Sequence, residues 1–134
     1  MWSCTRCGRI FQKTKQPHSC KTVPLKEHFK NKDYARELFD VLVEKTYKIG
    51  NCNIISLPCC IHLFGKYDFL AILPKKDGLE IRFTLTRKVE GARLKQAVSL
   101  SKSTYKNCVE ITNKQAIDKE LMGWLTESYF LKGA

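Results

Sequence analysis

Apolar side chains recur at helical spacing early in the chain, within residues 33–50. They follow the i, i+3, i+4, i+7 pattern that places side chains on one face of a helix. Asp33 is a suitable N-terminal cap, and Gly50 stands where such a helix can end. The stretch therefore predicts an amphipathic helix whose buried face carries Ala35, Leu38, Phe39 and Leu42.

The apolar period changes to two in the middle of the chain. Residues 79–85 alternate apolar and polar side chains, which is typical of a half-buried strand. Residues 67–74 are more apolar and predict a more buried strand, and the Asp-Gly pair at 77–78 favours a tight hairpin turn between the two. This turn is expected to place Leu73 opposite Glu80.

Further strands are predicted on both sides of this hairpin. Residues 52–58 and 60–65 indicate one or two strands separated around Pro58. Segment 86–104 has no sustained period and predicts a long basic loop, with at most a short helix. Residues 105–112 predict another strand.

A second helix is predicted at the C-terminal end of the sequence, where Thr112 or Asn113 can act as its cap. Because large aromatic residues at helical spacing are usually packing residues, Trp124 is expected in the core. The apolar stripe of this helix consists of Ile117, Leu121, Trp124 and Leu125.

Three cysteines and a histidine near the N-terminus have the spacing C-x2-C-x10-H-x-C, and they are Cys4, Cys7, His18 and Cys20. Zn²⁺ prefers four such sulfur and nitrogen ligands in a tetrahedron, and a C-x2-C turn presents two sulfurs to one ion. Four protein ligands leave no position for water, so the spacing predicts one structural Zn²⁺ ion per chain. A segment this short cannot bury a core of its own, and without metal it should be disordered.

The order of these elements favours an α+β domain, because the hairpins are grouped together and do not alternate with helices. We expect an antiparallel sheet of three to five strands covered by two helices, preceded by a small zinc-finger-like hairpin. The predicted boundaries are a zinc-finger-like segment at residues 1–21, a linker at 22–32 and the α+β domain at 33–134.

Several motifs of the sequence resemble an uncharacterised prokaryotic family, domain of unknown function 5655. They are MWSCTRCGRIF, HSC, ARELFDVLV, YDFLAILPKKDGLEIRFTL and WLTESY. The resemblance covers nearly the whole chain, and the Cys/His motif and the LPKKDGLEI hairpin are its most specific parts. It implies an α+β module with a small zinc-finger-like N-terminus, also found fused to other domains, and it implies no reaction.

The formal net charge of +11 is concentrated in two blocks. Residues 1–32 hold eight Lys/Arg and one acidic residue, and residues 82–106 hold seven Lys/Arg and one acidic residue. Such blocks suit nucleic acid or an acidic protein surface. The leading hypothesis is a non-catalytic module that contacts nucleic acid mainly through phosphate, whose contacts are Arg6, Arg9, Lys13, Lys15, Arg87, Lys88, Arg93 and Lys95. The second block also contains Arg82, Lys102 and Lys106.

The alternative hypothesis is a small-molecule-binding or enzymatic α+β domain with a purely structural zinc finger. A deep pocket with convergent polar groups favours this alternative, and a continuous positive surface joining both blocks favours nucleic acid. Cys60 and His62 share a strand face, but no third or fourth ligand lies near them in sequence, so they are expected to be ordinary buried side chains. No catalytic residue is predicted.

The cysteine content bears on the compartment. The seven cysteines are an odd number, and the sequence begins with no export signal, so the thiols are expected to be reduced and the protein cytoplasmic. No apolar run approaches the roughly 18 residues that a membrane span needs, and no membrane contact is expected.

Overall fold

The computed structural model describes residues 2–7, 9–11, 13–18 and 20–133. The strands are β1 (Trp2–Ser3), β2 (Ile10–Phe11), β3 (Asn53–Ser56), β4 (Ile61–Phe64), β5 (Asp68–Lys75), β6 (Gly78–Leu85), β7 (Leu94–Ser99) and β8 (Tyr105–Ile111). The helices are α1 (Asp33–Tyr47) and α2 (Lys119–Ser128). Shorter helical turns are η1 (Leu25–Phe29), η2 (Lys114–Ala116) and the π-helical η3 (Tyr129–Gly133).

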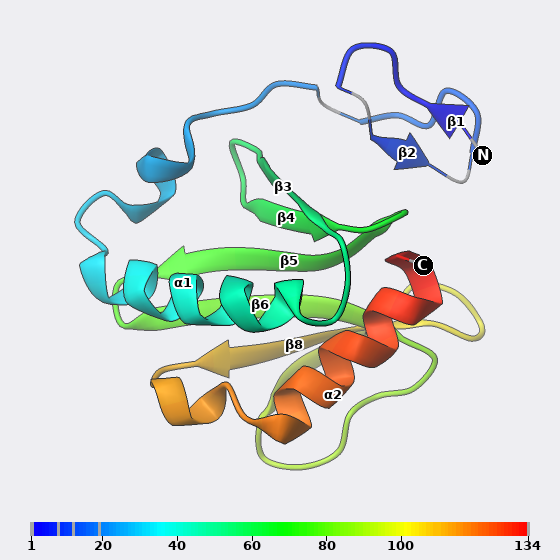
Figure 1. Cartoon of the computed structure of the whole chain (residues 1–134). Coiled ribbons are helices and arrows are strands. Elements are labelled where there is room, and N and C mark those ends of the chain that lie inside the picture. Colours follow the sequence, from blue (N-terminus) through cyan, green and yellow to red (C-terminus); the bar gives the residue numbers. More distant parts are fainter. Residues whose placement is uncertain (1, 8, 12, 19, 134) are drawn as a thin grey trace.

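Strands β3 to β8 form one antiparallel sheet in the order β3-β4-β5-β6-β8-β7, while β1 and β2 form a separate two-stranded hairpin. Helices α1 and α2 cover one face of the larger sheet (Figure 1). We call the opposite face of the sheet the outer face. The predicted α+β class is confirmed, but the expected count of three to five strands is wrong, because the main sheet has six.

The additional strand is β7, which lies within the segment predicted to be a long basic loop. It is an edge strand that pairs only with β8, and its side chains are exposed or half-buried throughout. Because neither face of β7 is buried, its residues need not alternate between apolar and polar. A prediction that relies on this alternation therefore cannot detect the strand.

The β5–β6 hairpin has the predicted register. Leu73 pairs with Glu80, and Lys75 pairs with Gly78 across the turn. This register turns Leu79, Ile81, Phe83 and Leu85 toward the helices, and their neighbours Glu80, Arg82 and Thr84 toward the outer face.

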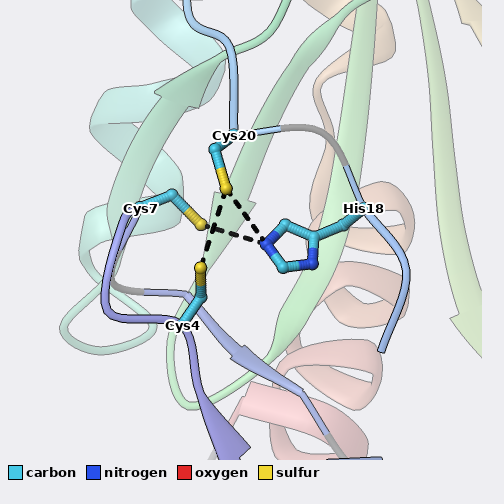
Figure 2. Close-up of side chains that lie close together, drawn as sticks. All are labelled: Cys4, Cys7, His18 and Cys20. Carbon is cyan, nitrogen blue, oxygen red and sulfur yellow. Dashed lines mark hydrogen bonds between the residues drawn. The ribbon is translucent and has the colours of Figure 1, made fainter. Parts of the chain in front are cut away.

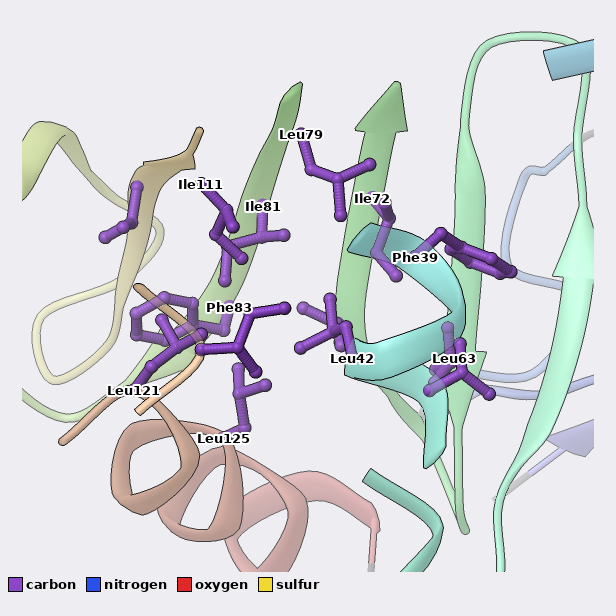
Figure 3. Packing of buried hydrophobic residues seen from close by; sticks show 14 of the residues in the cluster. Phe39, Leu42, Leu63, Ile72, Leu79, Ile81, Phe83, Ile111, Leu121 and Leu125 are labelled. Atoms are coloured by element: carbon purple, nitrogen blue, oxygen red, sulfur yellow. The ribbon is translucent and has the colours of Figure 1, made fainter. Parts of the chain in front are cut away.

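The core lies between the sheet and the two helices (Figure 3). The predicted stripe of α1 is fully or almost fully buried, and Phe39 and Leu42 point at β4, β5 and β6. From α2, Leu121 and Leu125 enter the same cluster. Trp124 is 7% exposed and stacks on Phe83 with ring centroids 5.9 Å apart, which confirms its expected place in the core.

The C-terminal helix begins later than predicted. Asp118 caps α2 by accepting a hydrogen bond from the Leu121 N–H, and the predicted cap Asn113 instead accepts from Ala116 N–H in the short turn η2. Ile117 therefore precedes the helix, although it is buried with the helical stripe.

The segment between the Cys/His motif and α1 packs against the domain. The Val23 N–H donates a 3.0 Å hydrogen bond to the Ser56 carbonyl, and Phe29 is buried with its ring centroid 5.0 Å from that of Phe39. His28 Nε2 lies 2.7 Å from the Leu57 carbonyl oxygen. Among the described residues, no helix has the length and apolar character needed to cross a membrane.

Candidate metal centre and cationic pocket

The N-terminal hairpin carries the first two predicted metal ligands in its turn. Strands β1 and β2 pair antiparallel, and the Cys4 N–H donates a 2.9 Å hydrogen bond to the Arg9 carbonyl, which closes the loop that holds Cys7. The Phe11 ring packs on the His18 ring with centroids 4.3 Å apart. Apolar packing around the hairpin therefore brings the second half of the motif to the first.

The four predicted ligands converge as the spacing predicts (Figure 2). Cys4 Sγ lies 3.6 Å from Cys20 Sγ, and His18 Nε2 lies 3.4 Å from the sulfurs of both Cys7 and Cys20. A tetrahedral Zn²⁺ ion with Zn–S bonds of about 2.3 Å and Zn–N bonds of about 2.0 Å separates two sulfurs by about 3.8 Å and a sulfur from a nitrogen by about 3.5 Å. The cluster can therefore hold a metal ion after only small side-chain movements.

The histidine ring is fixed by a partner outside the cluster. His18 Nδ1 lies 2.7 Å from the Gln16 carbonyl oxygen, so Nδ1 carries the proton and donates. Nε2 is then the free acceptor and faces the sulfurs. Histidine ligands of metals are commonly oriented through the other ring nitrogen in this way.

Local hydrogen bonds favour thiolate at the first two cysteines. The Cys7 backbone N–H lowers the pKa of Cys4 to about 6. Burial acts to raise the pKa of Cys7, but hydrogen bonds from the backbone and side chain of Arg9 outweigh it, and that pKa is lowered. Burial, followed by the neighbouring thiols, raises the pKa of Cys20 to about 11. An ion that binds here must displace the Cys20 proton, so metal affinity should rise with pH.

A pocket of about 330 Å³ lies between the N-terminal hairpin and the outer face of the sheet. Cations from three elements line it, namely Arg9 of the hairpin, Arg82 of β6 and Lys106 of β8, together with one acidic residue, Asp68 of β5. Phe11 and Phe64 are among its apolar lining. We call this the cationic pocket, and it joins one member of the first basic block to two members of the second.

The other predicted cations of the N-terminal segment lie on its surface. Arg6, Lys13 and Lys15 are exposed. Arg9 differs from them because it is only 8% exposed, with its guanidinium 5.2 Å from the centre of the Phe11 ring. Arg9 therefore supports the hairpin as well as lining the pocket.

Two of the predicted cations of the second block pair with acidic residues at α2. Arg87 Nη2 lies 3.0 Å from Glu127 Oε1. Arg93 Nη1 lies 2.9 Å from Asp118 Oδ1, and its guanidinium stacks 5.4 Å from the centre of the Trp124 ring. Both arginines are held by the helix, and neither lines the cationic pocket.

The other two predicted cations of this block lie near β8. Lys95 Nζ lies 2.8 Å from Glu80 Oε1 and 2.9 Å from Glu110 Oε1. Lys88 is exposed, with its Nζ 5.5 Å from the centre of the Tyr105 ring. Three of the four predicted cations of this block, Arg87, Arg93 and Lys95, are thus paired with acidic residues. The two basic blocks meet at the cationic pocket.

The structure adds Cys59 and Asp68 to the Cys60–His62 pair, so the expectation that no third donor lies near this pair is wrong. His62 Nδ1 lies 2.5 Å from Asp68 Oδ2, and His62 Nε2 lies 3.0 Å from Cys60 Sγ. Cys59 Sγ is 3.1 Å from Cys60 Sγ. Burial raises the pKa of Cys60 to about 12. The period-two spacing of Cys60 and His62 indicated their shared face, but the approach of Asp68 depends on a register shift after Leu63 that no local pattern announces.

Comparison with known proteins identifies the larger part of the chain. A family model described as Domain of unknown function (DUF5655) matches residues 25–132. The match includes both helices and the whole six-stranded sheet, and it begins after the Cys/His cluster. No curated protein and no solved structure matches the chain.

Proposed function

The chain belongs to the family of this domain of unknown function, and we propose that it is a zinc-binding, non-catalytic module that contacts nucleic acid through the cationic pocket. The convergence of cations from both basic blocks on one pocket carries this proposal.

Zinc is the ion that best fits the donor set. Three sulfurs and one imidazole nitrogen are soft or borderline donors, and they suit a tetrahedral ion without redox chemistry. Four protein donors fill the tetrahedron, so the ion's role is to hold the hairpin in place. The hairpin in turn supplies one wall of the pocket.

The lining of the pocket suits a nucleotide unit. Lys106 offers positive charge for a phosphate, while Phe11, Phe64 and Tyr67 offer aromatic surface for a base. Arg82 also lines the pocket, but its guanidinium is paired with Glu80 at 2.7 Å. Proteins that bind single strands combine a cationic groove with aromatic side chains on which bases stack. A duplex keeps its bases stacked inside, so we expect single-stranded DNA or RNA to bind more tightly than duplex.

Four exposed cations outside the pocket extend the proposed contact surface. Arg6, Lys13, Lys15 and Lys88 carry the phosphate contacts outside the pocket in this proposal. Arg87, Arg93 and Lys95 are neutralised by nearby acids. We therefore assign these three mainly to stability.

Fluorescence anisotropy with labelled single-stranded and duplex oligonucleotides across a salt series tests the proposal. Lys106→Ala should weaken binding and reduce the slope of log K against log salt by about 0.7 for a single strand. Lys119→Ala, at an exposed position on α2, removes the same charge away from the pocket and should leave the slope unchanged. If the parent protein forms no complex with any oligonucleotide at about 0.1 M salt, nucleic-acid binding is wrong.

A second candidate function is the binding of a small anionic molecule, with the zinc-held hairpin as a structural wall. The observation in its favour is the size of the pocket, about 330 Å³, which lies at the lower end of the roughly 300–1,000 Å³ typical of ligand pockets. Mononucleotides and oligonucleotides of increasing length distinguish the two candidates. Affinity that grows with length supports nucleic acid, and affinity already complete with one nucleotide supports the small ligand.

A further inference from the structure

A second group of metal-ligand side chains lies at the turn between β3 and β4, outside the N-terminal cluster. The Leu57 N–H donates a 2.9 Å hydrogen bond to the Cys60 carbonyl, which closes a tight turn with Pro58 and Cys59 at its corner. This turn brings two consecutive cysteines together, although consecutive side chains of a regular strand point to opposite faces. His62 then lies on the same face as Cys60, two residues along β4.

Three donor atoms converge at this turn. The sulfurs of Cys59 and Cys60 are 3.1 Å apart, and Cys60 Sγ is 3.0 Å from His62 Nε2. All three donor atoms lie within 4.8 Å of one another. The sulfur–sulfur separation is about 0.7 Å and the sulfur–nitrogen separation about 0.5 Å shorter than a tetrahedral zinc ion requires. Rotation of the exposed Cys59 side chain can widen the first, and the second requires a small shift of the His62 ring.

The histidine of this group is oriented as a metal ligand is. Asp68 Oδ2 lies 2.5 Å from His62 Nδ1, on the side of the ring away from the sulfurs. A carboxylate beside the other ring nitrogen is the usual outer partner of a metal-bound histidine. Asp68 takes this place as an ion-pair contact, although Nδ1 does not complete a well-aligned hydrogen bond. The same arrangement occurs at His18, where the Gln16 carbonyl takes the place of the carboxylate. Two independent histidines thus present Nε2 to cysteine sulfurs with an oxygen behind Nδ1.

We propose that Cys59, Cys60 and His62 form a second metal site, with Asp68 orienting His62, and that it binds Zn²⁺ through three protein ligands. Within the described part of the chain, no fourth Cys, His, Asp or Glu joins this group. A three-ligand shell leaves one position for water or an exogenous ligand, in contrast to the closed N-terminal centre. We therefore expect weaker zinc binding here than at the N-terminal cluster.

A nucleophilic cysteine is the competing account, because the order Cys60, His62, Asp68 also places a base beside a thiol. The position of Cys60 counts against this account, since its side chain is 9% exposed and, unlike His62 and Asp68, it does not line the cationic pocket. The exposed Cys59 gives a metal ion access to the group.

Titration of the metal-free full chain with Co²⁺ under reducing conditions measures the number of sites. The parent protein should bind two equivalents with sulfur-to-cobalt charge-transfer absorbance. Cys7→Ser and Cys59→Ser should each bind one equivalent, and Cys52→Ser, outside both clusters, should still bind two. Asp68→Asn should weaken only the second equivalent, by about 10- to 100-fold. One equivalent in the parent, unaffected by Cys59→Ser, overturns the proposal.

Thiol alkylation followed by mass spectrometry provides a second readout that does not depend on stoichiometry. In the Cys7→Ser variant, Zn²⁺ should slow alkylation of Cys59 and Cys60 but leave that of Cys108 unchanged. Circular dichroism before titration verifies that each variant is folded. Equal alkylation rates with and without Zn²⁺, or rapid alkylation of Cys60 alone, contradict the metal site, and the second result favours a reactive thiol.

Discussion

Lys95 of β7 forms a 2.8 Å ion pair with Glu80 of β6, across the strand β8 that separates them in the sheet. Glu80 also accepts hydrogen bonds from Arg82, and its side chain is only 5% exposed. Lys95 reaches the exposed Glu110 of β8 in the same conformation. The outer face thus carries an acid with little access to water that depends on two cations from different strands.

The Glu80 pair predicts a pH-dependent contribution to stability. Lys95, and then Arg82, lower the pKa of Glu80 from 4.5 to about 2 in the folded chain. Because the folded pKa is depressed, the stabilisation is fully present above the unfolded value near 4.5 and is lost as the pH falls toward 2. Glu80→Gln should reduce the free energy of unfolding by about 1–3 kcal/mol at pH 7.

Urea unfolding at pH 7, 4 and 2 measures this contribution. The difference between the parent and Glu80→Gln should shrink as the pH falls. Glu110→Gln is the matched control, since Glu110 is exposed and should contribute less than about 1 kcal/mol. A Glu80→Gln difference that stays constant from pH 7 to pH 2 would show that the charge of Glu80 is not the cause.

Removal of metal from the N-terminal cluster should have a local effect. The hairpin has its own strand pair and its own aromatic contacts, while the main core is built from the sheet and helices. We expect chelation, or Cys7→Ser, to disorder residues 1–20 and to leave the sheet folded. Hydrogen exchange before and after chelation measures the protection of the backbone amides in each region of the chain. Loss of protection throughout β5 and β6 would mean that the hairpin and the domain unfold as one unit.

Trp124 should be among the residues that contribute most to stability. Its ring stacks on that of Phe83, and the Arg93 guanidinium makes a cation–π contact with it. Trp124→Ala should lower the free energy of unfolding by about 3–5 kcal/mol. Phe130→Ala, at a residue that is 62% exposed, is the control for loss of an aromatic ring and should change it by less than about 1 kcal/mol. A similar small effect of both would place Trp124 outside the core.

Two glycine-to-alanine substitutions should have opposite effects on the stability of the fold. A Cβ added at Gly78 collides with the backbone carbonyl oxygen of Ile111, so Gly78→Ala must separate β6 from β8 and should destabilise by about 1–3 kcal/mol. At Gly123 of α2 an added Cβ meets no atom within 4 Å. Gly123→Ala should stabilise by about 0.4–1 kcal/mol, because alanine restricts the unfolded chain. Thermal denaturation of both variants tests the pair, and destabilisation by Gly123→Ala would contradict the packing described for α2.

The sequence predicted those elements in which one face is apolar and the other polar. The stripe of α1 and the alternation of β6 could be recognised because apolar side chains face the core and polar ones face away from it, even where the polar ones, such as Glu80, are also buried. The candidate metal cluster could be recognised for a different reason, because four donors must fall at spacings that one ion can bridge and this constraint is local in sequence.

The missed features depend on contacts between distant segments. Strand β7 has no buried face, so only its pairing with β8 reveals it. The pocket cations Arg9, Arg82 and Lys106 come from three separate elements, and their common location follows from how the hairpin sits on the sheet. Asp68 reaches His62 because of an irregular register between β4 and β5. Side-chain periodicity contains no information on such long-range placements.

The construction of the cationic pocket from two walls has a thermodynamic consequence. One wall belongs to the sheet and the other to the N-terminal hairpin, which we expect to be ordered only when its cluster holds a metal ion. A ligand that touches both walls therefore binds the metal-loaded chain more tightly than the metal-free chain. By reciprocity, the bound ligand must raise the affinity for the ion by the same factor. Occupancy of the pocket and retention of the metal are two coupled equilibria, and each can regulate the other.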